Sequence, residues 1–419
     1  MSGEERSRVE RAVETVARDS YGRLVAYLSA RSRDVAASED ALADAFVAAL
    51  RTWPTGGVPA NPDAWLLTAA RRRLIDRARH DKVRAAAADD LRYLLETTEG
   101  LCVSSPFPDE RLKLLFVCAH PAVDPAVHTP LMLQTVLGLD AATIGRAFLV
   151  APATMGQRLS RAKTKIRDAG IGFEVPGGDE LAPRLSAVLE AIYAAYGSGW
   201  DDVTGVDPRR RGLAGEAIWL ARTLLELMPG QAEGQGLLAM MLYCEARRPA
   251  RRGADGRYVP LSEQDTSLWS KALFEEADRT LASAARQMRP GRFQLEAAVQ
   301  SAHMDRARTG RTDWPAVALL YEGLVREAPA IGALVGRAAA VAEAGQPAAS
   351  LAQLDRLPLD AVRTYAPYWA ARAHILLHLG RTHEAMGALD RAIELTDEEA
   401  ARQFLLERRE SGSRARARE

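Results

Sequence analysis

Cationic side chains gather in two segments of the N-terminal half, and their chemistry is that of phosphate recognition. Residues 61–79 begin with Asn61, continue through Trp65 and then supply Arg71, Arg72, Arg73, Arg77 and Arg79. Residues 142–167 end in a second group, Arg158, Arg161, Lys163, Lys165 and Arg167. Guanidinium and ammonium groups neutralise DNA phosphates whatever the base sequence. Two such segments on one chain predict two separated contacts with one DNA molecule.

The first segment is predicted to form a helix from about residue 63 to residue 83. It follows a loop rich in helix breakers, Pro54, Gly56, Gly57, Pro59 and Pro62. Arginines beside such a loop combine phosphate contacts with the capture of unstacked bases in pockets or on aromatic faces. A solvated helix face is the ordinary alternative for a run of charge. Trp65 itself is predicted to be core rather than a stacking platform.

The second segment has the pattern of a helix-turn-helix. Pro152 suits the first turn of the second helix, where its missing N–H costs nothing. Met155, Leu159, Ala162 and Ile166 form one apolar stripe, so the opposite face carries Thr154, Gln157, Arg158, Arg161 and Lys165. Arg158 is the predicted base-edge reader because arginine pairs bidentately with guanine. Lys163, Lys165 and Arg167 are predicted phosphate contacts. A helical hairpin with a merely polar face is the alternative.

Composition favours helix almost throughout the 419 residues, because Ala and Leu dominate the hydrophobic 47% of the chain. The formal net charge is zero, so any nucleic-acid role depends on local charge. The three cysteines form no Cys-x-x-Cys pair, and no apolar stretch approaches the ~20 residues that span a bilayer. We therefore expect a cytoplasmic protein that has no membrane association, metal or cofactor.

Catalytic patterns are missing from the sequence, so no enzymatic activity is predicted. Two histidine groups have spacings that could serve metal ligation. His120 and His128 flank a segment with Cys118, and a packed or capping role is preferred for them. His374 and His378 stand four residues apart, with His383 nearby, and that spacing suits zinc. The acidic partner of a metalloprotease helix is not next to them, so metal binding is not the preferred interpretation.

Periodicity and breakers divide the chain into three helical units, an all-α fold. The first, residues 8–84, includes a helix from Ser38, its expected N-cap, to about Trp53, with Leu42, Phe46, Val47 and Leu50 on one face. Residues 85–109 are predicted to be a linker and residues 110–172 the helix-turn-helix domain. Residues 173–179 form a hinge. The third unit, 180–410, contains two segments aligned at an offset of 35 residues, near the ~34-residue period of tetratricopeptide repeats.

With these residues in view, the chain resembles bacterial RNA polymerase sigma factors of the extracytoplasmic-function group over roughly residues 15–170. Residues 39–46 resemble the helix that docks on the polymerase, residues 65–79 the promoter-melting helix, and residues 111–167 the domain that reads the upstream promoter element. The C-terminal extension is similar to that of a subgroup with a tetratricopeptide-like domain. Two positions depart from the family pattern, Ala43 where Gln is usual and Arg72 where Asn is usual.

The resemblance implies a dissociable initiation factor that binds RNA polymerase core and promoter DNA. It assigns polymerase contacts to Asp40, Asp44 and Arg51, and a regulatory role, through a possible partner protein, to the C-terminal domain. One alternative is a stand-alone helix-turn-helix regulator whose tail is a sensor. Another is a tail that binds a small molecule, with Tyr193, Trp200, Trp219 and Trp269 lining a pocket rather than a core.

Overall fold

Alanine- and leucine-rich segments separated by capping residues make this chain helical wherever the computed structural model describes it. The described residues are 3–82, 109–148, 150–201 and 213–416. Among them there is no β-strand, and one isolated bridge joins Arg252 to Tyr258. The predicted all-α class is confirmed. No helix in the described ranges is long and apolar enough to cross a membrane.

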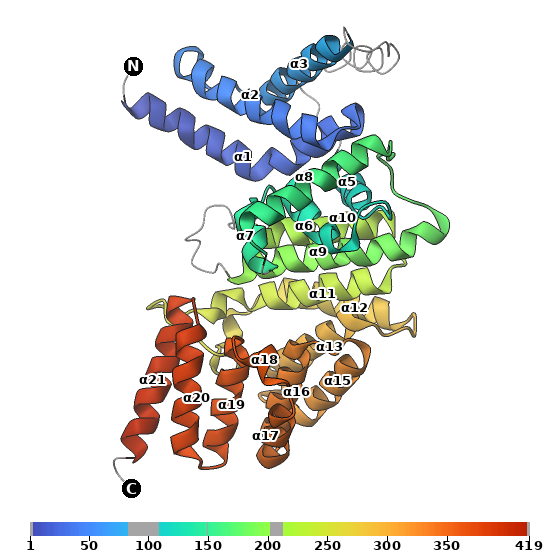
Figure 1. The fold of residues 1–419 in the computed structure, drawn as a ribbon. Coiled ribbons are helices and arrows are strands. Elements are labelled where there is room, and N and C mark those ends of the chain that lie inside the picture. Colours follow the sequence, from blue (N-terminus) through green and yellow to red (C-terminus); the bar gives the residue numbers. More distant parts are fainter. Residues whose placement is uncertain (1–2, 83–108, 149, 202–212, 417–419) are drawn as a thin grey trace. The chain divides into compact units, whose positions relative to one another are not determined.

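Two compact units divide the chain, Met1–Thr223 and Leu224–Glu419 (Figure 1). The first begins with a bundle of three helices, α1 (Gly3–Ser32), α2 (Val35–Gly56) and α3 (Pro62–Lys82). Asp34 caps α2, since its carboxylate accepts the N–H of Ala37 at 2.9 Å. The expectation that Ser38 is this cap was wrong. Ser38 lies one turn inside the helix, buried, and its hydroxyl donates to the Asp34 carbonyl at 2.8 Å.

Helix α2 buries a different face from the one predicted. Leu42 is buried as expected, and Phe46 is half-buried, but Val47 and Leu50 are 46% and 44% exposed. Besides Leu42 and Trp53, the core side of the helix is made of smaller residues, namely Val35, Ala37, Ser38, Ala41, Ala45 and Ala49. Alanines on that side allow the neighbouring helices α1 and α3 to approach closely. Val47 and Leu50 therefore contribute nothing to the core of this bundle and remain on its surface.

A second bundle in the first unit consists of α5 (Arg111–Cys118), α6 (Pro125–Thr135), α7 (Ala141–Ala147) and α8 (Pro152–Asp168). Asp124 and Asp140 cap α6 and α7, since their carboxylates accept the N–H groups of Ala126 and Thr143. Gly138 turns the chain between α6 and α7 with φ of 68°, a left-handed conformation that glycine tolerates. The predicted apolar stripe of α8 is confirmed, because Met155, Leu159, Ala162 and Ile166 are all buried.

Helices α9 (Leu181–Asp201) and α10 (Leu213–Leu227) follow the predicted hinge, yet they begin within the first unit. Helix α9 packs against α5 and α6. Arg111 joins the start of α5 to α10, since its guanidinium bonds Asp109 at 2.9 Å, pairs with Glu216 and lies 4.1 Å from the ring centre of Trp219. Unlike the predicted domain limit near residue 180, the division of the structure falls within α10, after Thr223.

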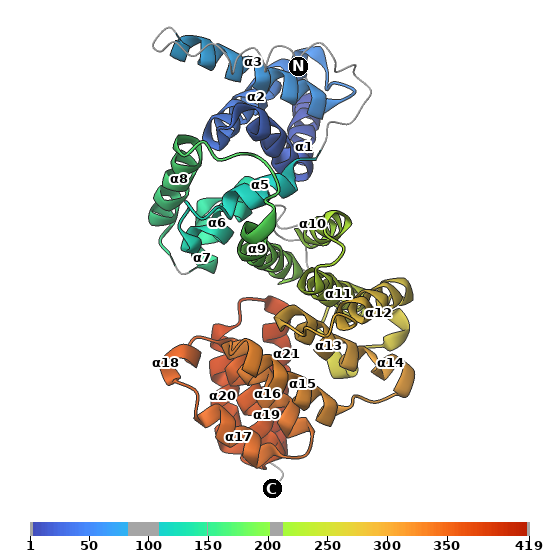
Figure 2. The same cartoon turned by 90° about the vertical axis from the view of Figure 1, so that its right-hand side faces the viewer.

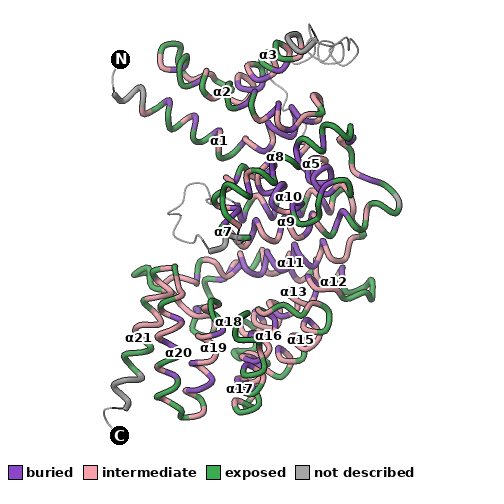
Figure 3. The backbone as a smooth tube through the Cα atoms, viewed as in Figure 1, coloured by how far each residue is buried: buried purple, intermediate pink, exposed green. Residues whose placement is uncertain are grey.

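Helical hairpins build the second unit. Its helices are α11 (Ala232–Ala246), α12 (Lys271–Ala285), α13 (Arg292–Met304), α14 (Arg306–Thr309), α15 (Trp314–Glu327), α16 (Ile331–Glu343), α17 (Pro347–Asp355), α18 (Leu359–Val362), α19 (Ala366–His378), α20 (Thr382–Leu395) and α21 (Glu399–Arg416). Helix α11 is buried almost all round (Figure 3). Helices α16, α19 and α20 lie side by side (Figure 2).

The 35-residue alignment corresponds to a repeated turn. Gly345 ends α16 and Gly380 ends α19, with φ of 88° and 72°. After each glycine the next N–H returns to a carbonyl five residues earlier, from Gln346 to Val341 at 3.1 Å and from Arg381 to Leu376 at 2.9 Å. Both are glycine-terminated helix ends of the same kind, and each leads into the second helix of a hairpin.

Because α9 covers α5 and α6, a fragment ending at Gly172 should be less stable than one ending at Pro229. The longer fragment retains α9, with its buried Leu185, Val188 and Ile192, and also α10. We expect the unfolding free energy of the shorter fragment to be at least about 2 kcal/mol below that of the longer one. Without α9, the apolar side chains of α5 and α6 that it covers would face water. Urea titration followed by circular dichroism measures this difference. Equal stability of the two fragments would show that α9 is not part of the first unit.

Candidate nucleic-acid interface

Helix α8 presents a polar and basic face to solvent. Thr154, Gln157, Arg158, Arg161 and Lys165 are all exposed, opposite the buried stripe that attaches the helix to its bundle. Helix α7 precedes it after a short turn, and the backbone N–H of Val150 returns to the carbonyl of Gly145 at 2.8 Å. Such an exposed helix on a small bundle has the dimensions to enter a DNA major groove.

Lys163 does not share that face. It lies four residues after Leu159 on the inner side of α8, is buried, and forms an ion pair with Glu39 of α2. Its predicted phosphate contact is therefore not available in this arrangement. Burial raises the pKa of the Glu39 carboxyl, and the opposing attraction of Lys163 only partly offsets that effect. The second carboxylate oxygen of Glu39 is buried with no hydrogen-bond partner among the described residues.

The backbone also brings the two bundles of the first unit together. A Cβ on Gly22 of α1 would lie 1.7 Å from the carbonyl oxygen of Val136, so no side chain fits there. Beside it, Tyr21 approaches the Gly138 turn, 3.0 Å from where a Cβ would stand. Arg167 of α8 lies 4.0 Å from Asp34, although its closer partner is Asp168 at 2.8 Å. Helices α2 and α8 are thus held together by an ion pair beside a close backbone contact.

The basic helix α3 distributes its arginines differently from the prediction. Arg71 turns inward and donates to the Tyr27 hydroxyl at 2.5 Å, and burial lowers the pKa of its guanidinium. Arg77 pairs with Asp40 at 3.1 Å on the surface. Arg72 and Arg73 are exposed and make no ion pair within the described ranges. The side chain of Arg79 lies outside the described residues. Arg72 and Arg73 are thus the arginines of this helix best placed for phosphate.

Asn61 and Trp65 have structural roles at the start of α3. The Asn61 side chain accepts the N–H of Ala64 at 3.1 Å and so caps the helix. Trp65 is half-buried and packs edge-on against Trp53, with ring centres 5.4 Å apart and planes at 71°. This agrees with the preference for Trp65 as core. A base contact by either residue stays a prediction.

A mixed acidic and apolar surface covers the outer side of α2. Asp40, Asp44 and Arg51 are all exposed there, as are Val47 and Leu50. Sequence reasoning missed the apolar pair because it placed both residues in the core. Charged residues around exposed aliphatic side chains are typical of a protein–protein contact.

The other candidate groups mostly have structural partners. His120 Nδ1 accepts the N–H of Ala122 at 3.1 Å, and buried His128 lies 3.0 Å from the Val123 carbonyl, in line with packed or capping roles. Burial raises the pKa of the Cys118 thiol to about 12. Of the four aromatic residues considered for a pocket, Trp219 packs under Arg111 in the first unit, and buried Trp269 lies 5.3 Å from the Arg306 guanidinium in the second.

Comparison with known proteins finds two segments that match protein families, and a relative that aligns over most of the chain. Residues 16–84 match the Sigma-70 region 2 family, which covers the second half of α1 and all of α2 and α3. Residues 184–285 match a family of unknown function, DUF6596. The uncharacterized protein R00370 of Rhizobium meliloti (strain 1021) is 37% identical over 381 residues, which are 90% of this chain and 89% of that protein.

Replacing Gly22 by Ala tests the contact between the two bundles. Alanine favours a helix interior by about 1 kcal/mol over glycine, so in isolation Gly22→Ala would stabilise α1. Against the Val136 carbonyl the added methyl should instead cost about 1–3 kcal/mol and open the contact. Acylation of Lys163 by an amine reagent, measured by mass spectrometry against exposed Lys165, should then increase.

Gly215→Ala is the matched control, because it also lies inside a helix and a Cβ there would meet nothing within 4 Å. It should be neutral or stabilising and leave Lys163 protected. Unchanged Lys163 reactivity and stability in Gly22→Ala would show that the bundles are not packed together in solution.

Proposed function

The chain carries a sigma-70 region 2 domain and so is a sigma-70 family factor, and it belongs to one family with the Rhizobium meliloti protein R00370; from this premise we propose that it is an extracytoplasmic-function-type sigma factor. It directs RNA polymerase core to specific promoters and assists promoter opening. Its C-terminal helical domain regulates that activity. The region 2 match on the α1–α3 bundle is the observation that carries this proposal.

The polymerase contact is proposed for the outer surface of α2. Asp40, Asp44 and Arg51 supply charge there, and Val47 and Leu50 supply exposed aliphatic area. Polymerase core is a fitting partner because the surface lies within the matched domain and opposite its buried core. Burying two aliphatic side chains among charges gives a contact with both affinity and orientation.

Promoter recognition is divided between two helices in this proposal. The exposed face of α8 reads the upstream element, with Arg158 at a base edge and Arg161 and Lys165 on phosphate. On α3, Arg72 and Arg73 hold the backbone where the strands separate. The ion pair between Lys163 and Glu39 draws α2 and α8 together, so a complex in which Lys163 reaches phosphate requires this contact to open.

The competing function is a stand-alone regulator that binds DNA without polymerase. The exposed face of α8 alone would serve it, whereas the exposed apolar pair on α2 favours the sigma factor. A gel-shift titration separates them. A sigma factor should shift promoter DNA with RNA polymerase core present and little without it, and run-off transcription should start at one site. Equal DNA affinity with and without core would support the stand-alone regulator.

Substitutions on α8 should separate base reading from phosphate binding. Arg158→Ala should weaken discrimination at one upstream base pair by ~1–3 kcal/mol, because a bidentate contact is lost. Lys165→Ala should lower affinity for all sequences alike and flatten the salt dependence. Lys113→Ala is the control, since it removes one half-buried cation, paired with Glu110, from the same bundle on α5. The assignment of α8 fails if both variants match this control on native and mutated promoters.

Arg72 and Arg73 should matter for strand opening. The double alanine variant should still bind core enzyme but form open complex about tenfold less well, because two phosphate contacts are removed. Permanganate reactivity of thymines near the start site measures opening. Arg8 and Arg11, exposed on α1, give a control double variant with the same charge change. Thymine reactivity equal to that of the control would exclude a melting role for α3.

A further inference from the structure

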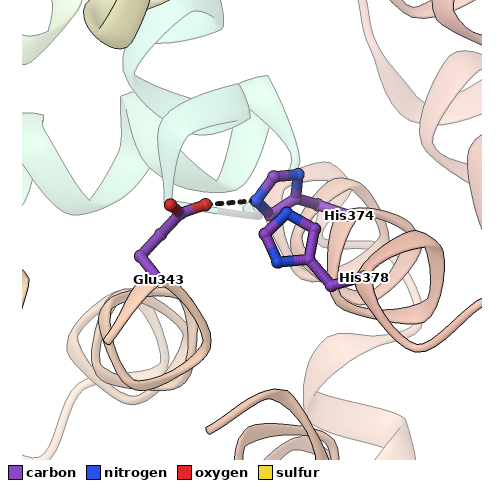
Figure 4. A group of neighbouring side chains, drawn as sticks. All are labelled: Glu343, His374 and His378. Atoms are coloured by element: carbon purple, nitrogen blue, oxygen red, sulfur yellow. Dashed lines mark hydrogen bonds and ion pairs between the residues drawn. The ribbon is translucent and has the colours of Figure 1, made fainter. Parts of the chain in front are cut away.

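We propose that Glu343, His374 and His378 form a binding site for a divalent transition-metal ion of the zinc type in the second unit. The two histidines stand four residues apart on α19, so both project from the same side of that helix. The structure adds the third ligand from elsewhere in the chain. Glu343 is the last residue of α16, and its carboxylate faces the two imidazoles (Figure 4).

The three side chains converge at ligand distance. Glu343 Oε1 lies 2.5 Å from His374 Nε2, and one ligand atom from each residue lies within 4.8 Å of the others. The imidazole ring centres are 4.4 Å apart. Ligands around a tetrahedral ion with bonds near 2.0 Å lie about 3.3 Å apart. The carboxylate and His374 therefore need to separate by about 1 Å, within reach of side-chain rotation.

The framework that holds these residues is a packed hydrophobic core. Helices α16 and α19 belong to one hydrophobic core, in which Ala342 next to Glu343 and both neighbours of His374, Ala373 and Ile375, are buried. Glu343 and His374 are half-buried and His378 is exposed. An ion can therefore enter from solvent and keep water in its remaining position. Two imidazoles and one carboxylate with an open position are a donor set that zinc accepts.

Arg408 of α21 competes with the ion. Its Nη2 lies 3.5 Å from His374 Nδ1, and a guanidinium can only donate. This contact leaves the His374 proton on Nε2, where it is donated to Glu343. Metal binding through Nε2 requires the other neutral tautomer, in which the single ring proton sits on Nδ1 and faces Arg408. The ion and Arg408 thus favour opposite tautomers of His374, so removing Arg408 should strengthen binding.

Zinc titration of the tag-free full-length protein, in competition with a chromophoric chelator, tests the site. The wild type should bind one Zn²⁺ here, and His378→Ala and Glu343→Gln should each weaken binding at least about tenfold. Arg408→Ala should tighten it. His383→Ala is the matched control, an exposed histidine on the neighbouring α20 that should bind like the wild type. Zn²⁺ should also raise the melting temperature of the wild type but not of His378→Ala.

Cobalt substitution distinguishes this site from adventitious thiolate binding. Co²⁺ held by nitrogen and oxygen gives visible ligand-field bands without a thiolate charge-transfer band. Because His378 is exposed, its alanine variant should fold normally, which circular dichroism verifies. The proposal is overturned if zinc affinity is the same in His378→Ala as in the wild type, if His383→Ala weakens it equally, or if no ion binds. None of these measurements involves polymerase or promoter DNA, so they leave the transcription proposal untouched.

Discussion

The ion pair between Lys163 and Glu39 is the interaction on which the arrangement of the first unit depends. Taking two charges out of water costs several kcal/mol, and their attraction returns that only with good geometry. One oxygen of Glu39 has no partner among the described residues, so the pair adds little net stability. Its importance lies in specificity. Separating the bundles leaves either charge uncompensated until water or another partner replaces it. Lys163 could therefore exchange Glu39 for another anionic partner at little net cost.

The backbone contact of Gly22 and the ion pair act together. Glycine permits the approach of α1 to the end of α6, and the approach places Glu39 within reach of Lys163. Around this contact the exposed face of α8 and the outer surface of α2 remain open to solvent. The first unit therefore keeps its proposed DNA-reading residues accessible, while Lys163 of the same helix stays buried in its ion pair with Glu39.

Much of this architecture could be predicted from sequence, because it depends on local chemistry. Pro152 stands in the first turn of α8 as predicted, and the predicted apolar stripe of that helix is buried. The sequence predictions failed where packing between helices determines which side chains are buried. The α2 core uses Ala45 and Ala49 rather than the larger Val47 and Leu50, and a pattern search favours large residues. Partner choice was equally hidden, since Arg71 meets Tyr27 forty-four residues away and Glu343 meets His374 thirty-one residues away.

The recurrent turn at Gly345 and Gly380 has an evolutionary consequence. Each turn closes its helix with the same pair of backbone hydrogen bonds and needs nothing from the other. In stacked hairpins each hairpin contacts mainly its neighbours, so the number of hairpins can change during evolution without loss of the fold. A gene duplication of about 35 residues, in phase with these glycines, would insert a complete hairpin without disturbing those on either side. Relatives of this chain can therefore differ in hairpin number while sharing one N-terminal bundle, and their alignments should break at these glycines.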